Sequence, residues 1–260
     1  MEDIVYISYF IENQLNFFEH YEKSVLTLIK KFYNKPFIFV TEQKIYDKIK
    51  DKITNYETLK IIIIDFTETN TYKNYFDRYN NLANKNAELL NNISAGGRWS
   101  NNNIRCLIIW HYKFELILLA KTLPYSHVCY IDAGICRDSA EFSRIRYSKG
   151  FCDSNFFIKD RNDIIINSVK KDLELEGNAK RLLLYGEYEI ACGHLCFSIN
   201  YLDELNLAYF KKLEDIADLG IITTEQRIFT LVMRDKYKLN PNVFTLKRII
   251  NCSYTIQFHM

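Results

Sequence analysis

The clearest candidate for chemistry in this chain is Asp132, which follows the apolar run His127–Ile131 and precedes Ala133 and Gly134. A strand that ends on an acid places that carboxylate at the carboxyl edge of an open sheet, where ligands of α/β proteins bind. The carboxylate is a hard oxygen ligand suited to Mg²⁺ or Mn²⁺, and the small residues after it allow a sharp turn and close approach to a diphosphate. The alternative is structural, because Asp often starts a turn after a strand.

The elements before Asp132 alternate short β-rich runs with longer helical patterns, which is typical of parallel strands joined by crossover helices. The expected strands are Ile4–Phe10, Phe37–Val40, Leu59–Phe66 and His127–Ile131. The expected helices are Leu15–Phe32, Lys44–Ile53 and Ile104–Leu119. The four isoleucines of the third strand predict burial on both faces. The polar, Asn-rich segment Asn70–Asn103 is predicted to be helical or irregular and to lie near a site.

After Asp132 the pattern predicts further strands and helices. The expected strands are Asn155–Ile158 and Tyr188–Ile199, and the expected helices are Asp163–Leu173, Tyr201–Ala217 and Thr224–Arg234. No internal repeat, low-complexity tract or linker divides the chain. We therefore expect one α/β domain over residues 1–260, with three layers and a mostly parallel central sheet.

Composition narrows the function classes. The 34 basic and 32 acidic residues leave a formal charge of +2, so no strong field favours nucleic acid or an anionic membrane. The seven cysteines show no paired zinc spacing and are interpreted as reduced, mostly buried thiols. The start, MEDIVYISYF, has no basic n-region, and no apolar run approaches a membrane span. These features predict an unprocessed cytoplasmic protein without a transmembrane segment.

Three segments in order carry a family resemblance. The run IIWHYKFELILLAKTLPYSHVCYIDAGICRD resembles the part of GT-A glycosyltransferases in which a helix with an inward basic residue precedes a strand and an acidic donor motif. IACGHLCFSINYL is similar to the small-residue turn and strand that follow, and TTEQRIFTLVMRDKY to the acidic-Gln helix start. Together they cover about the last 160 residues and look like the HtrL/YibB-like family of bacterial glycosyltransferases, with more distant similarity to glycogenin-type enzymes.

The resemblance implies a GT-A fold and sugar transfer from a nucleotide-sugar donor, with a UDP-sugar favoured, to a glycan or other hydroxyl acceptor. Asp132 would hold the Mn²⁺ or Mg²⁺ that bridges the two donor phosphates. Most such enzymes carry a second acid two residues later, where this chain has Gly134. His259 matches the metal-binding His near the carboxyl end of glycogenin-like enzymes; the alternative is a frayed terminal residue.

The resemblance also implies contacts to the donor. Lys113 would meet the phosphate or sugar as a point charge, the alternative being a solvated helix lysine. Arg98, in a Gly-Gly-Arg-Trp turn, would reach phosphate or be solvated. Gly193 would let a sugar approach the backbone, and His194 would donate to a hydroxyl or be a satisfied core histidine.

Glu225 and Gln226 follow Thr223-Thr224, which offers an N-cap, so the pair is expected at a helix terminus facing the site. The resemblance makes Glu225 a general base or a sugar-orienting carboxylate. The alternative is that an acid in the first helical turn stabilises the helix whatever the function.

Three further residues are candidates on the nucleotide side. Tyr9 and Phe10 lie where GT-A enzymes hold the nucleobase, and an aromatic ring there would stack on it unless it belongs to the core. Asp65 follows the strand of isoleucines and would bind ribose or base, unless it only caps the strand end.

Other function classes fit less well. A protein that keeps the glycosyltransferase-like fold without turnover is the main alternative, because Gly134 has replaced the second acid. A nucleic-acid-binding module would need basic clusters, and only Arg144, Arg146 and Lys149 come close. The chain contains neither the glycine fingerprint of dinucleotide-binding folds nor a phosphate-binding P-loop sequence.

Overall fold

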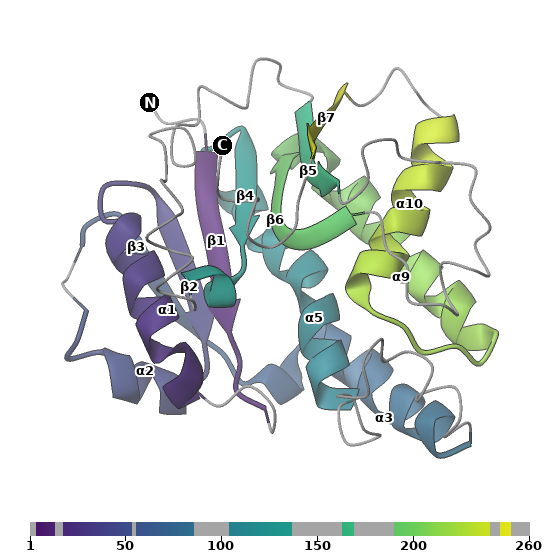
Figure 1. Cartoon of the computed structure of the whole chain (residues 1–260), viewed down its shortest axis with the longest axis horizontal. Coiled ribbons are helices and arrows are strands. Elements are labelled where there is room, and N and C mark those ends of the chain that lie inside the picture. Colours follow the sequence, from purple (N-terminus) through teal and green to yellow (C-terminus); the bar gives the residue numbers. More distant parts are fainter. Residues whose placement is uncertain are drawn as a thin grey trace.

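The computed structural model describes residues 4–13, 18–53, 56–85, 104–136, 163–168, 190–239 and 245–250. Within these ranges the core element is a seven-stranded sheet with the order β3-β2-β1-β4-β6-β5-β7 (Figure 1). The strands are β1 (Ile4–Phe10), β2 (Phe37–Thr41), β3 (Leu59–Ile63), β4 (His127–Ile131), β5 (Asp163–Ser168), β6 (Ile190–Ser198) and β7 (Thr245–Ile250).

The sheet is mostly parallel. β1 pairs in parallel with β2 and β4, and β2 pairs in parallel with β3. β6 is antiparallel to both of its neighbours, β4 and β5, while β7 is parallel to β5. β6 alone among the seven described strands therefore runs against the others. Its N-terminal half consequently lies beside the carboxyl end of β4, where Asp132 follows.

Helices cover both faces of the sheet. α1 (Phe18–Lys31) and α2 (Gln43–Ile49) pack on one face, together with the side chains of Ile4, Tyr6 and Phe10 from β1. The opposite face carries α3 (Asn70–Lys85), α5 (Ile104–Leu116), α9 (Leu202–Asp218) and α10 (Glu225–Leu239).

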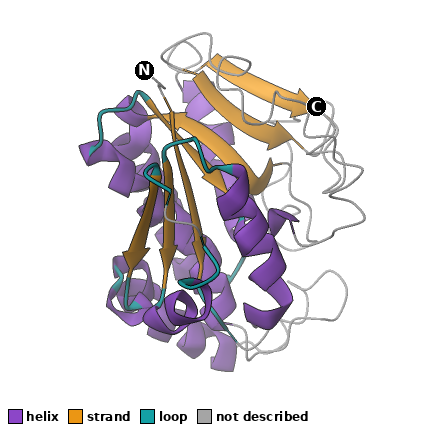
Figure 2. Ribbon diagram, turned by 90° about the vertical axis from the view of Figure 1, so that its left-hand side faces the viewer, coloured by secondary structure: helices purple, strands orange, loops and turns teal. Residues whose placement is uncertain are grey.

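The β1 side chains alternate strictly between these two cores, as the pleat of a strand requires. Figure 2 shows helices on both sides of the strands. The predicted three-layer α/β/α architecture with a mostly parallel sheet is confirmed.

Short 3₁₀ segments complete the described part of the chain. They are η1 (Phe66–Glu68), η3 (Ile117–Thr122), η4 (Ala133–Cys136) and η5 (Ile199–Tyr201). None of the helices in the described ranges combines the length and apolarity that a bilayer crossing needs. Four cysteines, Cys106, Cys129, Cys192 and Cys196, are buried.

Two expectations about the elements are wrong. Residues Asp163–Leu173 were expected to be helical, but Asp163–Ser168 forms β5, because a short run of isoleucines fits a strand as well as a helix until its neighbours are known. β3 was expected to be buried on both faces, but its burial is only partial and Ile63 is 42% exposed. β3 is the edge strand of the sheet, so it lacks a neighbour on one side. The strand expected at Asn155–Ile158 lies outside the described residues.

Candidate functional site at the carboxyl end of β4

Asp132 lies directly after β4 at the carboxyl edge of the sheet, as predicted. Its backbone N–H donates a hydrogen bond to the carbonyl of Gly193 over 2.8 Å, which extends the β4–β6 ladder by one residue. One carboxylate oxygen, Oδ1, accepts from the N–H of Gly134 over 2.7 Å and so closes a tight turn. The side chain is half-buried. Asp132 therefore does start a turn after the strand, which is the structural alternative given above. Its second carboxylate oxygen, Oδ2, takes no part in this turn.

The turn after Asp132 is fixed by helix α1. The hydroxyl of Ser24, which is fully buried, donates to the carbonyl of Ala133 over 2.6 Å. Gly134 faces the ring of Tyr21, and a Cβ added at Gly134 would lie 2.8 Å from Cε1 of that ring and 3.0 Å from Oδ1 of Asp132. The space beside Gly134, where the family resemblance leads us to look for a second acid, is thus occupied by an aromatic ring from α1.

Lys113 lies beneath this edge on α5 and is 3% exposed. Its Nζ donates to the carbonyl of Cys192 over 3.1 Å and to Oε1 of Glu225 over 3.0 Å. It also lies 5.0 Å from the ring centroid of Tyr130. Burial by itself lowers the pKa of Lys113, but the charges of Glu225, Cys192 and Asp132 together with the Glu225 hydrogen bond outweigh it, and the pKa lies above its ordinary value. The solvated alternative for Lys113 is wrong, because the side chain is buried and its charge is engaged by Glu225. A contact with the donor stays a prediction.

Glu225 begins α10 and is 6% exposed, so it faces inward at the helix terminus as predicted. Oε1 is bound by Lys113, whereas Oε2 is buried without a hydrogen-bond partner. Thr224 precedes it, and its carbonyl accepts from the N–H of Ile228, but its hydroxyl makes no hydrogen bond. The side-chain N-cap that the sequence suggests is therefore not formed. Gln226 is half-buried in the same first turn.

Tyr130 belongs to the same cluster, and the sequence interpretation missed it. It is 1% exposed on the strand that leads to Asp132. Burial, followed by the charges of nearby groups that include Asp132 and Glu225, raises its pKa well above the ordinary value. The signal was available, because residues two apart on a strand share a face, so Tyr130 points to the same side as Asp132.

The proposed base-stacking rings are both in the core. Tyr9 is 6% exposed and its hydroxyl donates to the carbonyl of Ile109 over 2.5 Å. Phe10 is 5% exposed on the other face of the sheet, with its ring centroid 5.2 Å from that of Tyr21. Neither ring offers an open face to a nucleobase, because β1 is a central strand covered by helices on both sides. The core alternative holds for both residues.

Asp65 is an exposed cap. Its Oδ1 accepts from the N–H of Thr67 over 2.9 Å and from the Thr67 hydroxyl over 2.6 Å, at the start of η1. The hydroxyl bond and the backbone bond lower the pKa of Asp65. This carboxylate lies at the same sheet edge as Asp132, but its hydrogen bonds are those of a local turn.

The remaining candidates are only partly placed. The backbone of Gly193 lies beside Asp132, and His194 pairs with Ile131 in the β4–β6 ladder. The side chain of His194 is not among those described. Arg98 and His259 lie outside the described residues. Their proposed roles stay predictions.

In the turn after β4, Asp132 is the one described carboxylate that could bind a metal ion. Among the described side chains, no group of three His, Cys, Asp or Glu residues is arranged to hold a metal. A site built by protein ligands alone therefore does not fit the described residues. A single carboxylate fits Mg²⁺ or a similar hard ion whose other ligands are phosphate oxygens and water.

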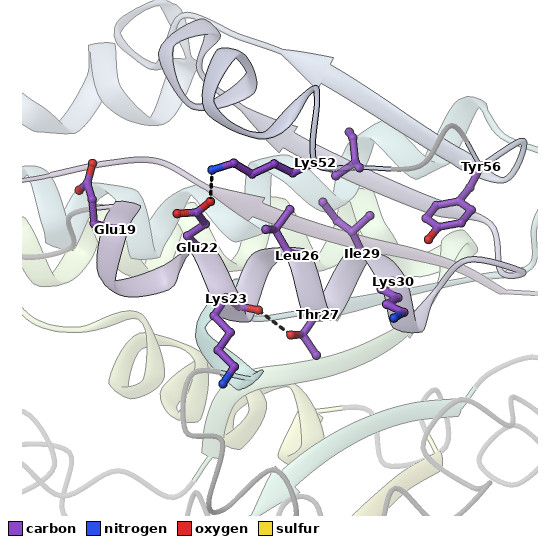
Figure 3. A pocket seen from close by; sticks show the side chains of 10 residues that line it. Glu19, Glu22, Lys23, Leu26, Thr27, Ile29, Lys30, Lys52 and Tyr56 are labelled. Atoms are coloured by element: carbon purple, nitrogen blue, oxygen red, sulfur yellow. Dashed lines mark hydrogen bonds and ion pairs between the residues drawn. The ribbon is translucent and has the colours of Figure 1, made fainter.

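A pocket of about 550 Å³ lies apart from these residues, on the outer side of α1 (Figure 3). Its walls include Glu22, Lys23, Leu26 and Tyr56, and Lys52 forms an ion pair with Glu22 across it. Its charged side chains are exposed or half-buried and of both signs. The pocket does not include Asp132, Lys113 or Glu225, so the candidate chemistry lies elsewhere.

No protein-family model matches the chain, and no curated protein matches it in sequence. Solved structures do match in shape; one is the crystal structure of mannose-1-phosphate geranyltransferase from Thermus thermophilus. It has a TM-score of 0.39 and 6% identity, over 96% of this chain and 74% of that chain. Function must therefore be argued from the site.

Proposed function

We propose that the chain is a glycosyltransferase that moves a sugar from a nucleotide-sugar donor, a UDP-sugar by preference, to a hydroxyl group of a glycan or other acceptor. The observation that carries the proposal is a convergence at one sheet edge. The backbone N–H of Asp132 donates to the carbonyl of Gly193 in β6. The Lys113 ammonium donates both to the carbonyl of Cys192, the residue before Gly193, and to the carboxylate of Glu225. One half-buried and one buried carboxylate are thus assembled from segments about 90 residues apart.

The donor half of the proposal uses Asp132. Its turn through Gly134 and its bond to Gly193 fix the carboxylate at the edge where α/β proteins bind ligands. A divalent ion, Mn²⁺ or Mg²⁺, would offset the charge on the departing nucleoside diphosphate. The part of Asp132 is to hold this ion together with the donor phosphates.

The acceptor half uses Glu225. Transfer forms a bond between the acceptor oxygen and the anomeric carbon, while the nucleoside diphosphate leaves with the electron pair of the old bond. The acceptor hydroxyl must lose its proton in this step, and a carboxylate can take it or orient the sugar. The unpartnered Oε2 of Glu225 has the capacity to accept that hydrogen bond.

A second candidate is a protein of the same fold that binds nucleotide or glycan without turnover. The contact between Tyr21 and Gly134 favours it, because the ring fills the place of the second acid and leaves Asp132 as the sole carboxylate of that turn. The two candidates differ in whether bound donor is consumed.

The deciding experiment is calorimetric titration of UDP, GDP and their sugars, with and without Mn²⁺. Asp132→Asn is the informative variant, because an Asn oxygen can still accept from the N–H of Gly134 while the charge is removed. Asp65→Asn is the matched control, since it removes a carboxylate from the same sheet edge. We expect Mn²⁺-dependent UDP binding that Asp132→Asn abolishes and Asp65→Asn preserves.

Release of UDP from a bound UDP-sugar, with water or a sugar as acceptor, separates the two candidates. Binding followed by release supports the transferase, and binding without release over a long incubation supports the non-catalytic protein. If no nucleotide binds under any condition, both the donor site and the proposed function are wrong.

A further inference from the structure

We infer that Lys113 is a positioning residue: from helix α5 it holds Glu225 so that one carboxylate oxygen stays available to a ligand hydroxyl. The inference rests on the proposed function for its consequence in catalysis. The contact itself can be tested without it. It replaces the expectation that Lys113 meets the donor phosphate directly.

The Lys113 ammonium is engaged by neighbouring protein groups on all sides that the structure describes. An ammonium has three donors, and two are used on the carbonyl of Cys192 and on Oε1 of Glu225. The third side of the group faces the ring of Tyr130 at 5.0 Å. With the side chain 3% exposed, little of the charge is left for a phosphate.

The contacts of Lys113 join four elements of the fold around the site. Cys192 belongs to β6, Tyr130 to β4 and Glu225 to α10, so Lys113 connects all three elements to α5. Gly193, next to Cys192, accepts the hydrogen bond from the backbone of Asp132. Lys113 therefore sets the position of Glu225 relative to the strand that carries Asp132.

A second hydrogen bond connects helix α5 to the start of α10. His111, two residues before Lys113, is fully buried, and its Nε2 lies 3.1 Å from the carbonyl of Thr223. A carbonyl only accepts, so Nε2 carries the proton, and Nδ1 of the neutral ring accepts from the hydroxyl of Tyr209 over 2.5 Å. Helix α5 thus fixes both the approach to α10, at Thr223, and its first residue, Glu225.

The second carboxylate oxygen of Glu225, Oε2, is not used by Lys113. Lys113 engages Oε1 alone, and Oε2 of Glu225 is buried without a partner. A buried carboxylate oxygen with no hydrogen bond is costly, and a ligand hydroxyl would satisfy it. We conclude that Lys113 acts through Glu225, by holding its carboxylate in one orientation, and does not itself contact the donor.

The test is a double-variant cycle with Lys113→Met, Glu225→Gln and the combined variant. Lys113→Met keeps most of the length of the side chain and removes the ammonium group and its charge. For each protein, UDP affinity, the rate of UDP release from a UDP-sugar and the chemical denaturation midpoint are measured. We expect Lys113→Met to slow UDP release by roughly tenfold or more, as for loss of a general base, with UDP affinity unchanged within about twofold. The combined variant should release UDP no more slowly than Glu225→Gln, because both substitutions act on the same group, the Glu225 carboxylate.

Two results would overturn the inference. One is a tenfold loss of UDP affinity in Lys113→Met, which would make Lys113 a donor ligand. The other is a combined variant in which the two rate losses multiply, since Lys113 would then act apart from Glu225.

Denaturation covers the case in which the proposed function fails. A buried pair predicts that each single change lowers the midpoint and that the combined variant is no less stable than the worse single variant. If the wild type binds no UDP, or binds it without release, this cycle still decides whether Lys113 holds Glu225. Additive losses of stability would count against it.

Discussion

The α-carbon of Gly134 lies against the aromatic ring of Tyr21, so closely that a methyl group at position 134 would come within 2.8 Å of Cε1. The ring also packs on Phe10, with centroids 5.2 Å apart, which restricts its retreat. Helix α1 and the turn after β4 therefore pack closely against each other at Gly134. A larger residue at this position would require the Tyr21 ring to move.

Gly134→Ala should lower stability by about 1–3 kcal/mol, the usual cost of overpacking a close contact. The backbone at Gly134 is not in the left-handed region, so the cost is expected from the close contacts with the Tyr21 ring and with Oδ1 of Asp132. Tyr21→Leu in the same background should recover part of the loss. Thermal or chemical unfolding of the single and double variants measures this, and an Ala variant as stable as wild type would refute the contact.

The same contact predicts how a second metal ligand could be added. Gly134→Asp alone should bind Mn²⁺ no better than wild type, because the new side chain has no room beside Tyr21. Tyr21→Ala combined with Gly134→Asp should tighten Mn²⁺ binding, since two carboxylates would then share one turn. Calorimetry with Mn²⁺ alone checks it, with Tyr21→Ala as the control for loss of the ring.

Ser24→Ala should destabilise the protein by about 1–3 kcal/mol, because it leaves the Ala133 carbonyl without the hydroxyl that serves it over 2.6 Å in a buried site. Thr27→Ala on the exposed side of α1 is the matched control. Its hydroxyl only returns to the Lys23 carbonyl of the same helix, so its loss should change stability little. Denaturation midpoints compare the two. Equal effects would show that the Ser24 bond does not fix the turn.

The strands that frame the site could be predicted because their patterns are short, apolar and sharply bounded. β1 and β4 occur at the predicted residues, and the acid after β4 falls where a parallel sheet places its ligands. β5 was missed because a run of isoleucines carries no period that separates a strand from a buried helix. Its assignment depends on pairing with β6 and β7, which a local pattern does not contain.

The pairing inside the site was beyond the sequence interpretation for a similar reason. Lys113 and Glu225 are 112 residues apart, and only the packed fold brings them to 3.0 Å. A hint existed, since Lys113 sits in the apolar run IIWHYKFELILL, which offers little polar face for a solvated lysine. A lysine in such a run indicates a buried partner, although the run does not say which.

Tyr9→Phe should cost about 1–3 kcal/mol of stability, because it keeps the ring but removes the hydroxyl that donates to the Ile109 carbonyl and hydrogen-bonds the buried Tyr130 hydroxyl. UDP affinity should be unchanged, since the ring belongs to the core. Tyr33→Phe, at a ring that is 57% exposed, is the control and should be neutral. A selective loss of UDP binding in Tyr9→Phe would restore Tyr9 as a nucleotide ligand.

Stability should fall below about pH 6.5 in a way that depends on His111. Burial lowers the pKa of His111 from 6.5 to about 3, despite the bond to the Thr223 carbonyl. The groups around the ring are Lys113 from the same helix, Tyr79 from α3 and Tyr209 from α9. None of them is an acid that would stabilise the charged ring.

The folded state therefore keeps His111 neutral, while the unfolded chain binds a proton near pH 6.5. The stabilisation is complete above that pH and declines as the pH falls toward 3, by about 2 kcal/mol between pH 7 and pH 5. His111→Gln cannot titrate, so the difference in unfolding free energy between wild type and this variant should shrink by that amount over the same interval. His20→Gln, on the part of α1 that is exposed, controls for histidine content. A difference that stays constant from pH 7 to pH 5 would mean that His111 is not held neutral, and the tie between α5 and Thr223 would have to be redrawn.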